Sequence, residues 1–338
     1  MSTRRFDESD IRVRPNRHGS RPRTKERPEH ADAITAMVTG VDRGRYTLLV
    51  DEGGPDEHRA IAMKARELGR DRVVPGDRVD VVGDSSGDDG SLSRIVRIEE
   101  RTTVLRRSAD DSDAIERIIV ANADQLVIVT ALADPPPRMG MIDRILIAAY
   151  DAGIDPLLCL TKSDLDDPRE IIAAYEPLGV PIVVTRIGQE LSELRSYLDG
   201  HVSVLVGHSG VGKSTLVNAL IPSAHRATGV VNDVTGRGRH TSSAAIALEL
   251  PGGTGWVVDT PGVRSFGLSH VDPRNVLRSF SDLEELTEDC PRGCTHAATE
   301  PECALDAAVA DGTLQPERLA SFRRIQVADH PDRSERSN

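Results

Sequence analysis

The nine residues at 207–215, Gly-His-Ser-Gly-Val-Gly-Lys-Ser-Thr, constrain this 338-residue chain more than any other stretch. An apolar segment precedes them and a helical pattern follows, which is the setting of a phosphate-binding loop between a strand and a helix. Lys213 supplies a point charge for the β- and γ-phosphates, and the Ser214 hydroxyl is placed to bind Mg²⁺. We expect the nucleotide phosphates to be bound by Gly207, Ser209, Gly210, Val211, Gly212, Lys213, Ser214 and Thr215.

A base-reading motif, Thr-Lys-Ser-Asp at 161–164, follows the apolar segment 156–160. Asp164 can accept two hydrogen bonds from guanine donors that adenine lacks, while the stem of Lys162 packs over the base; such donor-specific contacts discriminate strongly. The tetrapeptide is common at helix starts, so a helix cap formed by Ser163 or Asp164 remains an alternative.

A third motif, Asp-Thr-Pro-Gly at 259–262, follows another apolar strand. Asp259 is predicted to orient a Mg²⁺-bound water, and the amide of Gly262 to meet the γ-phosphate. Thr241 is predicted to be the switch threonine that reaches Mg²⁺ only when GTP is bound.

The order of these motifs is reversed relative to a Ras-like domain, in which the phosphate loop comes first. Apolar strands alternate with amphipathic helices from about residue 112, which predicts a parallel sheet covered on both faces. The helical stripe consists of Ile142, Ile145, Leu146 and Ala149. Cutting a Ras-like chain before the strand 125–130, and joining its old ends before the strand 202–206, gives the observed order. Because the termini of a domain lie close together, such a circular permutation preserves the nucleotide site.

Together with the GTPase domain, the sequence predicts five parts. Five short strands in 31–107 fit an OB-type β-barrel, although an SH3-like barrel fits the same pattern, and 106–113 reads as a linker. The predicted parts are a disordered basic arm (1–30), the barrel (31–107), a circularly permuted Ras-like α/β GTPase domain (112–270), a mostly helical zinc-binding domain (271–328) and a disordered tail (329–338).

The cysteines cluster near the end of the chain: Cys290, Cys294, His296 and Cys303 lie within fourteen residues. Three thiolates and an imidazole form a closed, tetrahedral structural zinc set with no open position for a substrate. Reduced surface thiols are the alternative. The fourth cysteine, Cys159, lies in an apolar strand and is expected to be a small core residue.

The formal charge of −12 is unevenly spread, because residues 1–30 hold nine basic and five acidic side chains, leaving −16 on the remainder. This acidity argues against a protein that coats naked nucleic acid, although a basic arm can contact phosphates on a larger particle. The sequence has no signal-peptide pattern and no apolar run long enough to span a membrane, so we expect a cytoplasmic protein.

Taken together, the motifs resemble those of the RsgA (YjeQ) family of circularly permuted GTPases, which act in maturation of the small ribosomal subunit. The resemblance covers nearly the whole chain after residue 30. It implies a monomer that binds the small (30S) subunit and its rRNA, hydrolyses GTP to GDP and phosphate with Mg²⁺, is released after hydrolysis, and carries one zinc. The barrel and the zinc domain are modules that can contact RNA. One departure is Thr161, where the commoner motif has Asn; it loses an amide that braces the site, which we expect to weaken nucleotide affinity.

The catalytic group is the least certain from sequence, because Val263 follows Gly262 where Ras-like proteins usually have Gln. His240, beside Thr241, is the nearest side chain able to position water, and the resemblance implies the same role. A solvated loop histidine is the alternative.

Two other functions fit parts of the sequence. One is a ribosome- or RNA-binding module whose guanine nucleotide is structural and barely hydrolysed. The other is an ATP-dependent kinase, which Asp164 and the lack of an evident acceptor pocket disfavour.

Overall fold

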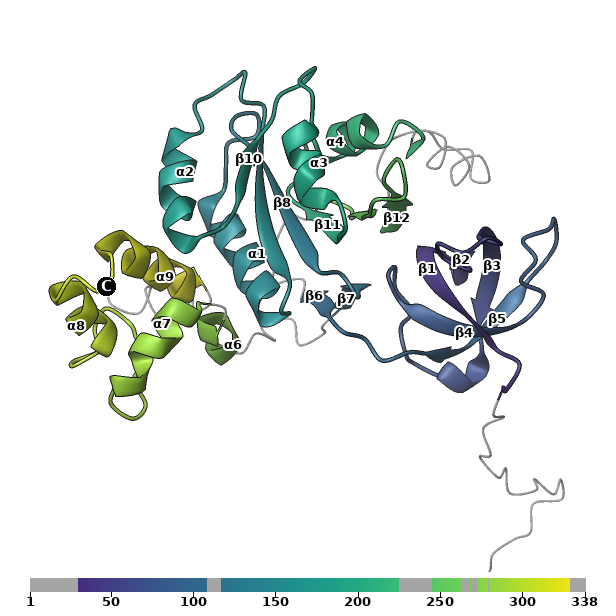
Figure 1. The fold of residues 1–338 in the computed structure, drawn as a ribbon, viewed down its shortest axis with the longest axis horizontal. Coiled ribbons are helices and arrows are strands. Elements are labelled where there is room, and N and C mark those ends of the chain that lie inside the picture. Colours follow the sequence, from purple (N-terminus) through teal and green to yellow (C-terminus); the bar gives the residue numbers. More distant parts are fainter. Residues whose placement is uncertain are drawn as a thin grey trace, which may run out of the picture. The chain divides into compact units, whose positions relative to one another are not determined.

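The central feature of the fold is a sheet in the order β10-β9-β8-β11-β13-β12 (Figure 1). The computed structural model describes residues 30–107, 117–224, 245–262, 268, 273–278 and 280–328. All neighbours from β10 to β13 pair in parallel, and β12 pairs antiparallel with β13. The carboxyl ends of the parallel strands therefore lie at one edge. The strands are β8 (Gln125–Ala131), β9 (Asp155–Thr161), β10 (Ile182–Val184), β11 (Val202–Val206), β12 (Ile246–Glu249) and β13 (Trp256–Asp259).

The position of β11 confirms the predicted permutation. This strand leads into the phosphate loop and follows β8, β9 and β10 in sequence, yet it lies between β8 and β13 in the sheet. Val204 is paired with Leu126 on one side and with Val258 on the other. The strand that would begin an unpermuted domain thus comes after β8, β9 and β10 in this chain.

Helices cover both faces of this sheet (Figure 1). One face carries α1 (Met139–Asp151), α2 (Arg169–Tyr175) and the 3-10 turn η3 (Glu176–Leu178), and the other carries α3 (Ser192–Leu198) and α4 (Lys213–Leu220). Side chains of β8 alternate between the two cores, because successive strand residues point to opposite faces. The predicted apolar stripe of α1 is buried at all four positions.

The N-terminal barrel has five strands in a closed circuit, β1-β2-β3-β5-β4, with β4 pairing back to β1. The strand β3 runs parallel to β5, and the other pairs are antiparallel. This arrangement agrees with the OB-type prediction. The elements are β1 (Ile34–Asp42), β2 (Arg45–Val50), β3 (His58–Lys64), the 3-10 turn η2 (Arg66–Leu68), β4 (Arg78–Gly83) and β5 (Ser93–Ile98).

A two-stranded ribbon, β6 (Val104–Arg107) and β7 (Arg117–Ala121), occupies part of the segment predicted to be a linker. Its apolar side chains Leu105 and Val120 are fully buried in the core that contains α1. Burial of these residues explains why the chain is ordered here. The polar composition that suggested a linker begins only at Arg106.

The C-terminal part is helical, as predicted, and its apolar residues belong to the same core as α1. Tyr150 of α1 packs edge-to-face on Phe280, which packs in the same way on Phe322. By their contacts, residues 32–338 form one unit. The elements are α6 (Pro273–Arg278), α7 (Ser281–Leu286), the 3-10 turn η4 (Thr287–Asp289), α8 (Ala304–Ala310) and α9 (Pro316–Ala328).

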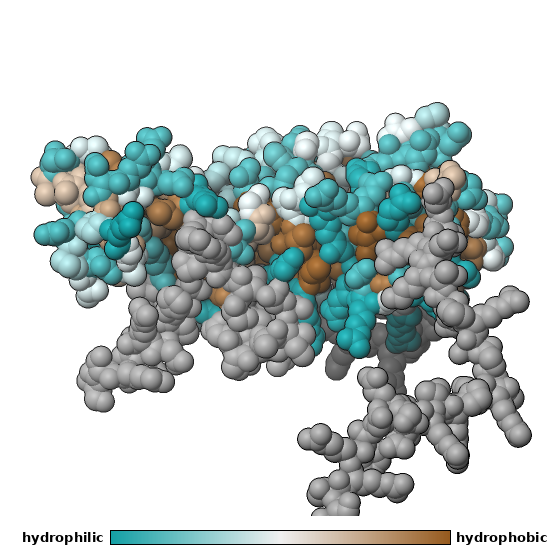
Figure 2. Space-filling view, turned by 90° about the horizontal axis from the view of Figure 1, so that it is seen from below, coloured by the Kyte–Doolittle hydropathy of each residue, from teal (hydrophilic) through white to brown (hydrophobic). Residues whose placement is uncertain are grey.

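The surface mixes hydrophilic and hydrophobic side chains. On the face shown in Figure 2, hydrophobic residues emerge in separate small areas among hydrophilic ones. Among the helices that the structure describes, none combines the length and the hydropathy needed to span a membrane.

Candidate functional site

The predicted phosphate loop connects β11 to α4 at the carboxyl edge of the sheet. A side chain at Gly207 would place its Cβ 2.1 Å from the Val129 carbonyl oxygen, so only glycine fits beside β8. Gly212 is the N-cap of α4 with φ of 96°, in the left-handed region that glycine adopts without strain. These two positions explain why the loop requires glycine at both ends.

Lys213 lies inside the loop rather than on the surface, with 7% of its area exposed. Its Nζ donates to the carbonyl oxygens of Gly207 at 2.7 Å and His208 at 3.3 Å. Burial lowers the pKa of Lys213, and the nearby carboxylate of Asp259 opposes this shift. The lysine is thereby held next to the loop amides, where a bound phosphate group would be neutralised.

The Asp-Thr-Pro-Gly motif meets this loop from β13. Burial raises the pKa of Asp259, and Lys213 opposes the shift. The buried hydroxyl of Thr260 donates to the Leu205 carbonyl at 2.6 Å, which fixes the motif to β11. A Cβ on Gly262 would lie 3.1 Å from the Cα of Ser209, so this glycine approaches the loop closely.

The base motif is tied to the phosphate loop through Thr161. Its buried hydroxyl donates to the Val211 carbonyl at 2.6 Å, and the Thr130 carbonyl oxygen lies 3.3 Å away. The amide of the commoner Asn is absent, as the sequence indicates, but the threonine hydroxyl supplies a brace of its own. The expected effect on nucleotide affinity stays a prediction.

Two neighbouring segments hold the rest of the base motif. The Nζ of Lys162 donates to the Asp134 carbonyl in the segment between β8 and α1. The amide of Ser163 donates to the Thr185 carbonyl at 3.2 Å, just after β10. The motif thus lies between two other strand ends of the same edge.

Asp164 is exposed and does not cap the following helix. That helix, α2, begins at Arg169, and its N-cap residue is Pro168. The helix-cap alternative is therefore wrong for Asp164. Its carboxylate is accessible to a ligand at the sheet edge.

The structure brings together three motifs that lie far apart in sequence, and it adds residues that the motifs did not identify. Thr260 lies within the Asp-Thr-Pro-Gly motif, and Thr185 directly follows a third parallel strand. Both could therefore have been recognised in the sequence as candidate site residues. The proposed switch residues His240 and Thr241 lie outside the described residues. Ser214 and Thr215 are exposed in the first turn of α4.

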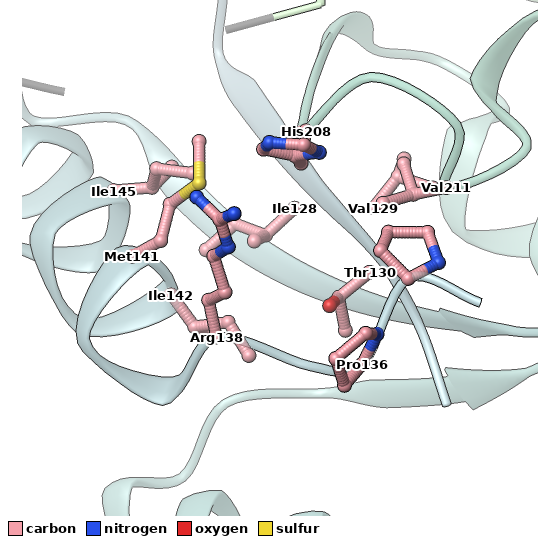
Figure 3. Close-up of a pocket in the computed structure, with 12 residues that line it drawn as sticks. Ile128, Val129, Thr130, Pro136, Arg138, Met141, Ile142, Ile145, His208 and Val211 are labelled. Atoms are coloured by element: carbon pink, nitrogen blue, oxygen red, sulfur yellow. The ribbon is translucent and has the colours of Figure 1, made fainter. Parts of the chain in front are cut away.

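A small cavity borders the phosphate loop on the side of α1 (Figure 3). Side chains of Met141, Ile142 and Ile145 from α1 line one side of it, and His208 and Val211 from the loop line the other. Arg138, which immediately precedes α1, also lines this cavity. Neither Arg138 nor His208 belongs to the predicted nucleotide contacts.

The predicted zinc ligands form one cluster in the C-terminal part. The ligand atoms of Cys290, Cys294, His296 and Cys303 lie within 4.8 Å of one another. Nδ1 of the histidine faces all three sulfurs, at 3.6, 3.5 and 3.9 Å respectively. Three sulfurs and one imidazole nitrogen at this spacing are compatible with tetrahedral zinc.

Two further contacts hold residues of the cluster in place. The amide of Ala304 donates to the Sγ of Cys290 at 3.3 Å, and Arg323 donates to the His296 carbonyl at 2.9 Å. Such contacts orient ligands in metal sites. Cys159 is separate and fully buried, and burial raises the pKa of its thiol to about 12, as expected of a core residue.

Two solved structures share this fold. YjeQ from Thermotoga maritima superposes with a TM-score of 0.65 and 26% identity, covering 88% of this chain and 98% of that one. YloQ, described as a circularly permuted GTPase, has a TM-score of 0.62 and 22% identity, covering 89% of this chain and 96% of the other.

Sequence comparisons agree with the structural ones. The model of the family described as RsgA GTPase matches residues 98–269. A protein of Pseudomonas aeruginosa named small ribosomal subunit biogenesis GTPase RsgA is 41% identical over 256 residues, 73% of this chain and 74% of its own. A protein of the same name from Pseudomonas syringae pv. tomato is 41% identical over 271 residues, 78% of this chain and 76% of its own. With the phosphate loop, the base motif and the permuted sheet in place, the chain belongs to the RsgA family of circularly permuted GTPases.

Proposed function

We propose that this protein hydrolyses GTP to GDP and phosphate during late maturation of the small ribosomal subunit, and that hydrolysis releases it from the subunit. One observation carries the proposal: the Thr161 hydroxyl joins the base motif to the Val211 carbonyl of the phosphate loop. A site that holds these two motifs together fits a guanine base and its phosphates at once. The relatives' names point to the small subunit as the place of action.

In the proposed site, Asp164 accepts hydrogen bonds from guanine and Lys162 packs against the base. The loop amides from Ser209 to Thr215 and the Nζ of Lys213 hold the phosphates. The buried Lys213 supports this assignment, since a cation surrounded by amides at a helix N-terminus is a favourable site for anions.

Mg²⁺ is expected to accompany GTP, where it neutralises charge on the β- and γ-phosphates. The donor set fits this ion, because the Ser214 hydroxyl lies next to Lys213 in the loop and the Asp259 carboxylate lies close to the same lysine. Hard oxygen ligands are those that Mg²⁺ prefers. Thr241 is proposed to add a third oxygen in the GTP state.

His240 is proposed to position the attacking water, because Val263 has no group able to do so. Phosphoryl transfer depends mainly on positioning and charge stabilisation, so a neutral imidazole that accepts a hydrogen bond from water is sufficient. Gly262 lies close to Ser209 of the loop, and its amide is proposed to meet the γ-phosphate.

The proposal includes the remaining predicted parts. We propose a cytoplasmic monomer that carries one zinc at the Cys₃His cluster. We propose the predicted limits for its barrel (31–107), GTPase domain (112–270) and zinc domain (271–328), with a basic arm before them and a tail after them. The barrel and the zinc domain are proposed to contact the rRNA of the 30S subunit.

The Asp164→Asn variant tests base recognition. The amide presents a donor where guanine also presents one, so we expect affinity to move from GTP toward xanthosine triphosphate. Competition of GTP, XTP and ATP against a fluorescent guanine nucleotide measures this preference. Unchanged GTP affinity would remove Asp164 from the site.

The Thr161→Val variant tests the brace. It leaves the buried Val211 carbonyl without its donor, at a cost of about 1–3 kcal/mol. We expect GTP and GDP affinities to fall about tenfold, which corresponds to about 1.4 kcal/mol. Thr161→Ser, the matched control, keeps the hydroxyl and should bind like the wild type. Equal affinities for all three proteins would contradict the brace.

The Cys294→Ser variant tests the metal. Freshly purified protein should contain close to one zinc per chain by elemental analysis, and the variant should lose it. Structural zinc contributes on the order of 10 kcal/mol in small sites, so the C-terminal part should become protease-sensitive. Cys159→Ser is the control and should keep its zinc. A wild-type protein without zinc would refute this assignment.

The His240→Ala variant tests the proposed function itself. Hydrolysis in a single turnover should fall about 100-fold, since a positioned base contributes that much, while GTP affinity stays unchanged. The variant should also dissociate more slowly from small subunits after GTP loading. His201→Ala is the control, because His201 precedes β11 at the opposite end from the loop. Normal hydrolysis by the variant would show that another group positions the water. Very slow GTP hydrolysis by the wild-type protein on small subunits would favour the alternative in which the nucleotide is structural.

A further inference from the structure

The helix that follows the base motif lacks two common sources of stability. All seven residues of α2 are described, and none of those in its last turn is basic. Its N-cap, Pro168, makes no side-chain hydrogen bond to the first turn. Short helices are unstable alone, and the last carbonyl groups of any helix need external donors. The position of α2 must therefore be fixed by other parts of the chain.

Arg324, from the last helix α9, supplies that missing donor. Its two terminal nitrogens each lie 3.2 Å from the Ala174 carbonyl oxygen in the last turn of α2. The hydroxyl of Ser321 donates to the same carbonyl at 3.4 Å. A cation at this end of a helix is also favourable for the helix dipole. The guanidinium further lies over the Tyr175 ring, 4.8 Å from its centroid.

The same guanidinium is paired with a buried carboxylate of α1. Asp143 is 3% exposed, and it accepts a hydrogen bond from the Tyr175 hydroxyl at 2.8 Å. One terminal nitrogen of Arg324 lies 3.4 Å from its Oδ1, and Nε lies 3.3 Å from Oδ2 without the alignment of a hydrogen bond. Burial raises the pKa of Asp143, and Arg324 and Tyr175 oppose this shift. The Arg324 side chain is about one-third exposed, but Asp143 is buried, so removing Arg324 leaves the buried carboxylate without its charged partner.

The two helices joined by Arg324 flank the predicted base site. The segment before α1 provides the Asp134 carbonyl that accepts from Lys162. The helix α2 starts at Arg169, a short loop after Asp164. A change in the spacing of α1 and α2 therefore moves both Lys162 and Asp164.

We propose that Arg324 is a positioning residue for guanine-nucleotide binding: by bonding the end of α2 and the buried Asp143 of α1, it holds the base motif in its binding geometry. The inference rests on the proposed base site. It makes nucleotide affinity depend on docking of the C-terminal part. By linkage, bound nucleotide must stabilise that docking to the same extent.

The test compares full-length Arg324→Gln with wild type, using fluorescent GDP and GTP. Affinity for both nucleotides should fall at least tenfold, because both carry the base, while the number of binding sites per chain stays one. The single-turnover rate of bound GTP should stay within twofold, since the phosphates and water are not touched. Glu317→Gln, at an exposed position of the same helix, is the matched control and should bind like the wild type. Wild-type affinity in Arg324→Gln would overturn the inference.

The pH dependence separates positioning from general damage. Without Arg324 the pKa of Asp143 rises further, because burial still raises it and the opposing guanidinium is gone, so protonation of the carboxyl relieves the defect more as pH falls. The affinity defect of Arg324→Gln should therefore be smaller at pH 5.5 than at pH 8. The double variant Asp143→Asn/Arg324→Gln, which has no buried charge, should lose this dependence. A defect that is equal at both pH values in both proteins would overturn the inference.

Arg324→Lys covers the case in which Arg324→Gln does not fold. Lysine keeps a charge opposite Asp143 but cannot direct two nitrogens at Ala174, so we expect about fivefold weaker nucleotide binding. Undiminished binding by Arg324→Lys would overturn the inference. Asp164→Asn, measured in parallel, tests the base site separately: if it alters base preference while Arg324 variants bind normally, only the role of Arg324 fails.

Discussion

The nucleotide site depends on the parallel pairing of β11 with β8 on one side and β13 on the other. Hydrogen bonding between strands is indifferent to the order in which the strands occur in the chain, so the permuted sequence builds the same edge. A slip of one residue in this pairing would move Val204 and Leu205 each to the face of the sheet opposite its present one, because side chains alternate along a strand. It would also displace Gly207 from the Val129 carbonyl, where no other residue fits.

Much of this arrangement could be predicted from local patterns in the sequence. The stripe on α1, the glycines of the loop and the four zinc-type ligands each follow from spacings of a few residues, and strand-end motifs in a parallel sheet must share an edge. The contacts that hold the motifs in place could not be predicted in this way. The hydroxyl of Thr161 and its acceptor are 50 residues apart, and Arg324 is 181 residues from Asp143. Nothing in the sequence near either residue identifies its partner.

The ribbon beside the predicted linker could not be predicted from the sequence for a related reason. Leu105 and Val120 are too few to form a strong strand pattern, yet both are fully buried. Two apolar side chains suffice to order a ribbon when an existing core covers them. The buried charged groups also differ in their surroundings: Lys213 and Asp259 lie where an anionic ligand and a cation are expected, whereas Asp143 and Arg324 lie between helices.

The hydrogen bonds from Arg324 to Ala174 bear on the stage of synthesis at which the chain becomes able to bind nucleotide. Ribosomes synthesise chains from the N-terminus, and domains begin to fold as they emerge. The base motif and α2 are made before the phosphate loop, whereas Arg324 lies in α9, the last helix among the described residues. A nascent chain therefore has the base-binding segment long before the residue that completes its supporting helix. With the proposed role of Arg324, a nascent chain would reach full nucleotide affinity only after α9 has been synthesised and has docked on α1 and α2.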